Sequence, residues 1–254
     1  MTLSAFLISD IFTFLLIFCR VGTALMFMPG FGESYVNARA RLMFALGFSL
    51  VLTPSLQPSF PAPPDTIFGL ANIMIAEMLV GAFFGAITRF LIAAISTGGM
   101  IIAFQSSLAS AVVPDVAGTG GQGSSLGNFL AITALVLLFV TDLHHLLIGA
   151  LHDSYRIFSV GHFPDVSDFA AQASRMMAES FLVAMQIAAP HIVMGLVVYL
   201  AAGIIAKLMP NLQVFFIIVA PQLLLSFFLL MLAFNSIMMW YMEYFKTSIA
   251  RFIE

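Results

Sequence analysis

The chain consists of long apolar runs separated by short polar connections, which is the pattern of a bundle of apolar helices. A helix that crosses a bilayer needs about 20 mostly apolar residues. The clearest runs of that length cover about Ala5–Met28, Thr66–Ile87, Phe90–Ala111, Asn128–Leu151 and Phe181–Ala206. The pattern predicts an all-α membrane protein with about six long apolar helices, some of them kinked and paired in hairpins. Residues 1–254 are expected to form a single domain.

Several stretches depart from this simple pattern. A shorter run begins near Leu42 and is expected to end before Pro54, as half of a hairpin. Only Thr88 and Arg89 separate the second and third long runs, so the alternative is one long, bent helix. Asn211–Phe245 is too long for one straight span and contains Pro221, which predicts a kink or a hairpin.

The most polar part of the chain, His152–Glu179, still shows helical spacing. Its Phe169, Ala173 and Met176 recur at intervals of three and four residues. This periodicity predicts one amphipathic helix ahead of the run that starts at Phe181.

The composition explains what these helices face. Hydrophobic residues make up 61% of the chain, charged residues 8%, and the mean hydropathy is +1.08. Soluble domains are roughly 45–50% apolar and about 25% charged, so the excess must face lipid or partner subunits. The net charge of -3 gives no reason to expect a nucleic acid partner, and a lone cysteine, Cys19, excludes an internal disulfide.

A few charges lie within or beside the apolar runs, at Arg20, Glu77 and Arg89. A charge at the membrane centre costs about 2.5–3.5 kcal/mol. Glu77 and Arg89 are twelve positions apart, which is about 18 Å along a helix, too far for an ion pair. If buried, these charges need partners on another helix or another subunit. The alternative for the two arginines is that they extend to the lipid headgroups.

Small residues and prolines indicate close packing within the apolar runs. Gly81 and Gly85 form a GxxxG spacing that lets two helix backbones approach, and we interpret it as simple helix packing. Pro190, Pro210 and Pro221 break backbone hydrogen bonds at membrane depth. Such breaks are tolerated where protein or a water-filled cavity satisfies the backbone, which favours a larger assembly or a pore.

Two patterns could carry chemistry, and each has a simpler interpretation. Gly123–Gly127 matches the G-x-S-x-G nucleophile elbow around Ser125, but the elbow follows a strand, and the preceding glycine-rich sequence favours a flexible loop. Asp142, His145 and His152 fall near one helix face and could bind a metal. A helix end that reaches the polar interface is favoured there, so no catalytic residue, cofactor or metal is predicted.

The proline before His191 leaves two interpretations of that histidine. The imidazole could line a pore or relay protons. The favoured interpretation is that it hydrogen-bonds a carbonyl freed by Pro190.

The order of these features resembles the FliR/SctT family of type III secretion export-gate proteins. The resemblance covers nearly the whole chain and includes Arg20 ahead of Pro29-Gly30-Phe31, and Glu77 ahead of the glycine pair. It continues through a glycine-serine loop after Pro114 and the HHLLIGALHDSY stretch at residues 144–155. The most specific match is the run KLMPNLQVF at residues 207–215.

The resemblance implies a non-enzymatic subunit of a helical export gate, without a cofactor, at the flagellar or injectisome basal body of the bacterial inner membrane. One such chain would assemble with FliP-like and FliQ-like membrane subunits, and FlhB-like and FlhA-like export proteins would dock to the complex. Unfolded exported proteins would cross the membrane through it. The compact length of the chain favours a flagellar system over an injectisome.

The resemblance also assigns expected roles to residues. The glycine-rich loop after Pro114 would be the plug that blocks the closed pore. The charges expected at interfaces or in buried positions are Arg20, Glu77, Arg89 and Lys207. The residues expected in the plug are Pro114, Asp115, Gly118, Gly120, Gly121, Gly123 and Ser124.

Two other classes remain as alternatives. A small-solute or ion transporter or channel of the inner membrane would explain the charges and the broken helices, although no internal repeat is visible in the sequence. A membrane enzyme would use Ser125 or the histidines at 144 and 152, and it requires a structural context that the sequence does not indicate.

Overall fold

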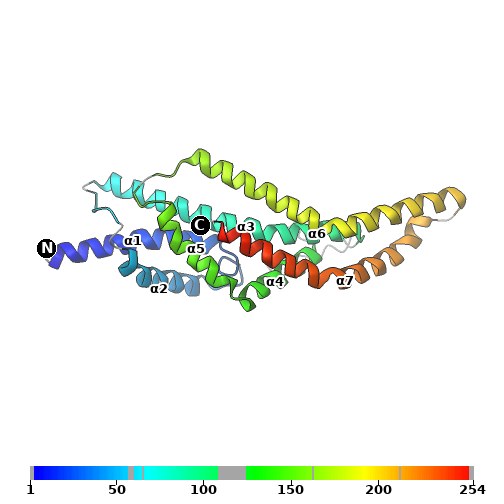
Figure 1. Cartoon of the computed structure of the whole chain (residues 1–254), viewed down its shortest axis with the longest axis horizontal. Coiled ribbons are helices and arrows are strands. Elements are labelled where there is room, and N and C mark those ends of the chain that lie inside the picture. The colour runs from blue at the N-terminus through cyan, green and yellow to red at the C-terminus, as the bar shows by residue number, and fades with distance from the viewer. Residues whose placement is uncertain are drawn as a thin grey trace. The chain divides into compact units, whose positions relative to one another are not determined.

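The structure is a computed structural model that describes residues 3–56, 60–64, 66–107, 124–161, 163–211 and 213–251. Within these ranges the chain forms seven helices and no strand, which confirms the all-α fold class (Figure 1). The helices are α1 (Leu3–Phe27), α2 (Ala38–Leu56), α3 (Ile67–Gln105), α4 (Ser125–Val140), α5 (Leu143–Ile157), α6 (Val166–Leu208) and α7 (Val214–Ala250).

Four of these helices are long and apolar enough to cross a membrane. They are α3, α6 and most of α1 and α7. The helices α4 and α5 pass the same test only as a pair, and they meet at an angle of 79°. The chain is therefore a membrane protein with several helical spans.

Three helices differ from the expected boundaries for simple reasons. The helix α3 runs without interruption through Thr88 and Arg89, so the alternative of one long helix is the correct one. The helix α6 begins at Val166 and includes both the amphipathic stretch and the apolar run. The two stretches form one helix because no glycine or proline separates them. Of the kink or hairpin expected in the last run, the hairpin is wrong, since α7 is one helix of 37 residues that contains Pro221.

The expected single helix over Asn128–Leu151 is also wrong. It is divided between α4 and α5 by Thr141 and Asp142. The backbone of Asp142 has φ 59°, in the left-handed region, which no right-handed helix can include. The short helix α2, by contrast, extends past its expected end and includes Pro54.

Polar side chains define where three helices begin. The Asn37 side chain accepts a hydrogen bond from the Arg39 amide at 2.9 Å at the start of α2. Thr66 accepts one from the Gly69 amide at 3.1 Å ahead of α3. Asp165 accepts one from the Ser167 amide at 2.9 Å ahead of α6. These caps satisfy amides that have no partner inside the helix.

The chain divides into two compact units. The first contains residues 1–90, 141–177 and 246–254. In it, α1 and α3 approach through the two glycines of the GxxxG spacing. A Cβ on Gly81 would overlap the carbonyl oxygen of Arg20, and one on Gly85 would lie 2.6 Å from the Cβ of Phe27. The glycines thus permit the backbone contact, and the predicted packing role is confirmed.

The second unit contains residues 91–140 and 178–245. Here α3 and α4 meet at another glycine pair, since a Cβ on Gly99 would lie 2.6 Å from the Cα of Gly127. The Tyr241 hydroxyl of α7 donates a 2.8 Å hydrogen bond to the carbonyl of Leu91 on α3. Small residues and one buried phenol thus hold this part of α3 against its neighbours.

Candidate functional site

The first unit is organised around a buried ion pair between α1 and α3. Arg20 is 0% exposed and Glu77 is 1% exposed. The Arg20 Nε lies 2.6 Å from Glu77 Oε2, and Nη2 lies 3.1 Å from Oε1. This two-point geometry is the strongest form of the arginine–carboxylate contact. Arg20 therefore does not extend to the headgroups, and its partner lies on another helix of the same chain.

The helix α5 and the residue that follows it complete the environment of the guanidinium. Arg20 Nη1 lies 3.4 Å from the Ser154 hydroxyl, and Nη2 donates a 3.1 Å hydrogen bond to the carbonyl of Phe158. The guanidinium carbon lies 4.0 Å from the centre of the Tyr155 ring, on which it stacks. Cation–π stacking and hydrogen bonds compensate for the loss of water around the charge. The arginine thus joins three helices at one buried point.

Sequence reasoning identified Arg20 and Glu77 but missed the contribution of α5. Ser154 and Tyr155 are both buried beside the arginine. Their only signal was that they end the HHLLIGALHDSY stretch.

The two remaining candidate charges lie elsewhere. Arg89 is exposed on α3, and Lys207 is exposed in the last turn of α6. Neither belongs to the cluster around Arg20. Arg41 has a defined structural role instead, since it donates hydrogen bonds of 2.7 and 2.8 Å to the carbonyls of Phe31 and Glu33. It fixes the turn between α1 and α2.

Most of the expected plug lies outside the described residues. This applies to Pro114, Asp115, Gly118, Gly120, Gly121 and Gly123. Ser124 is described and precedes α4 directly, where it is half-buried. Ser125, the serine of the elbow pattern, is the exposed first residue of α4.

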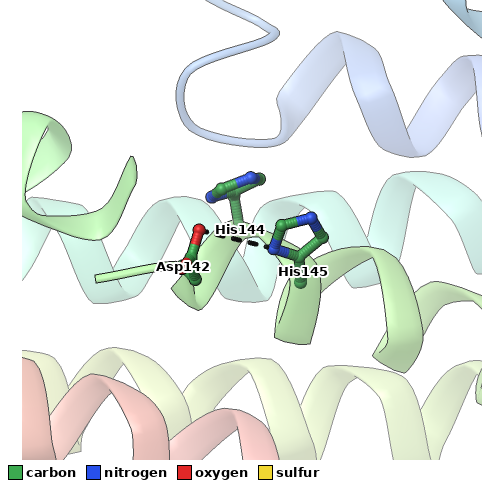
Figure 2. A group of neighbouring side chains, drawn as sticks. All are labelled: Asp142, His144 and His145. Atoms are coloured by element: carbon green, nitrogen blue, oxygen red, sulfur yellow. Dashed lines mark ion pairs between the residues drawn. The ribbon is translucent and has the colours of Figure 1, made fainter. Parts of the chain in front are cut away.

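A group of possible metal ligands lies where α4 meets α5. Figure 2 shows Asp142, His144 and His145, whose ligand atoms lie within 4.8 Å of one another. His145 Nδ1 is 3.7 Å from Asp142 Oδ1, and both side chains are largely exposed. His152, which the sequence placed with Asp142 and His145, instead pairs with Asp153 at 3.0 Å. The sequence therefore predicted His152 as the third member of this group, where the structure has His144.

The chemistry of this group does not favour a resident metal. Three ligand atoms are one fewer than a structural zinc site uses. The group also lies at the N-terminus of α5, where the helix dipole is positive and opposes a cation. A solvent-facing helix end remains the better interpretation.

Comparison with known proteins places the chain among bacterial export proteins. Residues 11–248 match the model of the family described as bacterial export proteins, family 1. The flagellar biosynthetic protein FliR of Caulobacter vibrioides is 38% identical over 224 residues, which cover 88% of this chain and 89% of that protein. The FliR of Bacillus subtilis is 31% identical over 236 residues, with coverage of 91% and 89%.

A further relative is less similar in sequence. The FliR of Escherichia coli is 28% identical over 191 residues, covering 74% of this chain and 71% of that protein. The matched region of the family model reaches all seven described helices and includes both members of the buried ion pair.

Proposed function

The chain belongs to the bacterial export proteins of family 1, the family of flagellar FliR, and on that premise we propose that it is a core subunit of a flagellar protein export gate. In this role it would help to form the conduit through which unfolded proteins cross the inner membrane. It would act without catalysis, and the buried cluster around Arg20 would hold helices together. FliP-like and FliQ-like subunits would surround it, and FlhB-like and FlhA-like proteins would dock to the assembly.

The observation that best supports this proposal is the apolar surface of α7. Its apolar segment Phe216–Ala250 has 35 residues, which is about 52 Å of helix, against a hydrocarbon thickness of about 30 Å. Only 17% of its most apolar window is buried within the chain. One bilayer crossing cannot cover such a length of apolar helix. Packing against other protein subunits would cover the remainder.

Large side chains make this surface suitable for packing. Phe216 and Met231 of α7 are each 79% exposed, and Leu208 at the end of α6 is 75% exposed. Exposed apolar patches of this kind mark contacts with protein or membrane. Exposed apolar side chains are not confined to one helix, as expected for a chain that has partners on several sides.

The composition of the assembly tests the proposal directly. The tagged chain would be co-expressed with its genomic neighbours, purified in mild detergent and examined by native mass spectrometry. We expect one copy in a large complex with two other small membrane proteins. A monomer or a homodimer alone would overturn the gate proposal and favour a small-solute transporter.

The proposed gate includes a plug formed by residues 114–124. Glycines at Gly118, Gly120, Gly121 and Gly123 permit many backbone states, which suits a segment that must leave a pore during transport. Deletion of residues 114–123 should make the assembled gate leak ions or a small dye. An assembled gate that stays tight after this deletion would contradict the plug.

A further inference from the structure

An open groove lies between α1 and α2 in the first unit, with a volume of about 210 Å³. Its walls come from positions between 18 and 26 of α1, from positions between 38 and 45 of α2, and from Met78 of α3. The lining side chains of Met26 and Leu42 are exposed, so the groove opens onto the surface of the chain. An apolar cavity of about 150 Å³ already takes up benzene. The groove can therefore hold part of an apolar ligand.

The walls of the groove are almost entirely apolar. The Thr23 hydroxyl, which lies on the α1 side, donates a 2.8 Å hydrogen bond to the carbonyl of Cys19 in its own helix. Among the described residues that line the groove, Arg41 is the one that carries a charge. A buried water needs two to four polar partners, so most of this surface suits an apolar ligand better than water.

Arg41 lies at one end of the groove, next to the connection between the two helices. It belongs to the first turn of α2, and its hydrogen bonds go to two carbonyls of that connection. On α1 the groove extends back from Met26 to Phe18, which is about 12 Å of helix. Both residues belong to the candidate span Ser9–Phe27. The charged end of the groove therefore lies where the span ends, and the apolar end lies inside the span.

The guanidinium of Arg41 retains donors for a ligand. A guanidinium has five N–H donors, and the contacts with the two carbonyls use Nε and Nη2. Arginine binds phosphate through charge-assisted, often paired, hydrogen bonds. Residues 28–45 contain Arg39 and Arg41 but only one acid, Glu33. The net positive charge of this region favours a negatively charged ligand.

A phospholipid has its groups in the same order as the groove. Its phosphate lies at the membrane surface, and its acyl chains extend into the hydrocarbon core. Basic pockets between membrane helices bind anionic headgroups. We propose that the groove binds one anionic phospholipid, with the phosphate at Arg41 and an acyl chain that lies along α1 toward Phe18. This inference goes beyond the proposed export role and does not depend on it.

Native mass spectrometry of the purified full chain tests the inference. The chain would be stripped of lipid in detergent and then supplied with phosphatidylglycerol or with phosphatidylcholine of identical acyl chains. We expect one phosphatidylglycerol to be retained per chain, with an affinity about fivefold above that of phosphatidylcholine. Glycerol 3-phosphate, which has the phosphate but no acyl chain, should not displace the lipid. Equal retention of the two lipids, or displacement by glycerol 3-phosphate, would overturn the proposal.

A substitution that fills the groove tests its location. Gly22 lines the groove, and a Cβ there would meet only the ring of Phe18, at 3.9 Å. Gly22→Leu should therefore occupy the space without moving the backbone and should abolish retention of phosphatidylglycerol. Gly47→Leu is the matched control on α2, because a Cβ there meets no atom within 4 Å and the residue does not line the groove. Retention that persists in Gly22→Leu would place the lipid elsewhere.

A second pair of variants tests the headgroup contact. Arg41→Gln removes the charge, so phosphatidylglycerol should bind no better than phosphatidylcholine, while Arg41→Lys should keep the preference. Arg39→Gln removes a charge from the same turn at an exposed position outside the groove, and the preference should persist. An equal loss in both glutamine variants would indicate general attraction to a basic surface and contradict the site. If Arg41→Gln does not fold, Arg39→Gln and Gly22→Leu still decide the question.

The same lipid should remain bound when the chain is in the complex with its genomic neighbours. Loss of the lipid on assembly would show that a partner subunit covers the groove, and it would overturn the proposal. Such a result would leave the export-gate proposal intact, because that proposal depends on the composition of the complex. Conversely, a chain that forms no complex but retains phosphatidylglycerol would contradict the gate and support the lipid site.

Discussion

The two units of this chain each contain one buried polar cluster, and the two clusters differ in kind. The first joins α1, α3 and α5 through the charged pair Arg20–Glu77, which has both charges compensated. The second joins α3 and α7 through Gln222 and Ser226, which are uncharged. The neighbouring His191 is buried and faces the backbone of Ser226.

The difference indicates different roles for the two clusters. Removing one partner of a buried ion pair leaves an uncompensated charge, at a cost of about 3–5 kcal/mol. A contact of that kind is suited to a permanent junction. Neutral hydrogen bonds cost much less to break, so the second cluster is suited to a weaker junction. The following predictions test this contrast.

The largest effect is expected from Arg20→Leu. It leaves the Glu77 carboxylate buried at 1% exposure without its cation, and should lower the free energy of unfolding by about 3–5 kcal/mol. Titration of the purified chain with SDS, followed by circular dichroism, would measure the change. Arg89→Leu makes the same substitution at an exposed position of α3. It should lower the stability far less, and equal losses would show that the burial of Arg20 does not matter.

Removing both charges should restore part of the lost stability. In the double variant Arg20→Leu with Glu77→Leu, no buried charge is left unpaired, and two apolar side chains replace the pair. Coupling between residues in direct contact is of the order of 0.5–3 kcal/mol, so the double variant should be more stable than Arg20→Leu alone. Both chains would be compared in the same SDS titration. A double variant that loses the sum of the two single losses would contradict the account of the ion pair.

A smaller effect is expected at the backbone contact between α1 and α3. The Cβ of Gly81→Ala would overlap the carbonyl oxygen of Arg20, which is backbone and cannot rotate away. Overpacking of this kind costs about 1–3 kcal/mol. Gly203→Ala in α6 is the control, because a Cβ there meets no atom within 4 Å. The thermal unfolding temperatures of both purified variants would measure the difference, which should vanish if α1 and α3 are not in backbone contact.

The sequence was sufficient for the parts of the fold that depend on local patterns. The apolar runs located α1, α3, α6 and α7 because lipid or protein burial requires continuous apolar helix. The GxxxG spacing likewise identified the contact of Gly81 and Gly85 with α1. Both features follow from residues that are close together in the chain.

The sequence was insufficient where residues distant in the chain meet. The pairing of Arg20 with Glu77 spans 57 positions, and the contact of Arg20 with Phe158 spans 138. No periodicity encodes such distances. The break at Asp142 was missed for a different reason, since nothing in the hydropathy pattern specifies the left-handed backbone of that residue. The polar residues Asp142, His144 and His145 lower the hydropathy there, but a short polar stretch alone does not distinguish a turn from a helix that reaches a polar interface.

The smallest stability effect is expected from Gln222→Leu, and it provides the sharpest test of the comparison. The change removes the hydrogen bond that Gln222 donates to the Gln105 carbonyl and the longer one that it accepts from the Ser107 hydroxyl. It should cost about 1–2 kcal/mol, mainly because one buried acceptor is left without its donor. In the SDS titration the loss of stability should therefore be well below that of Arg20→Leu. A loss as large as that of Arg20→Leu would show that the uncharged cluster is also a permanent junction.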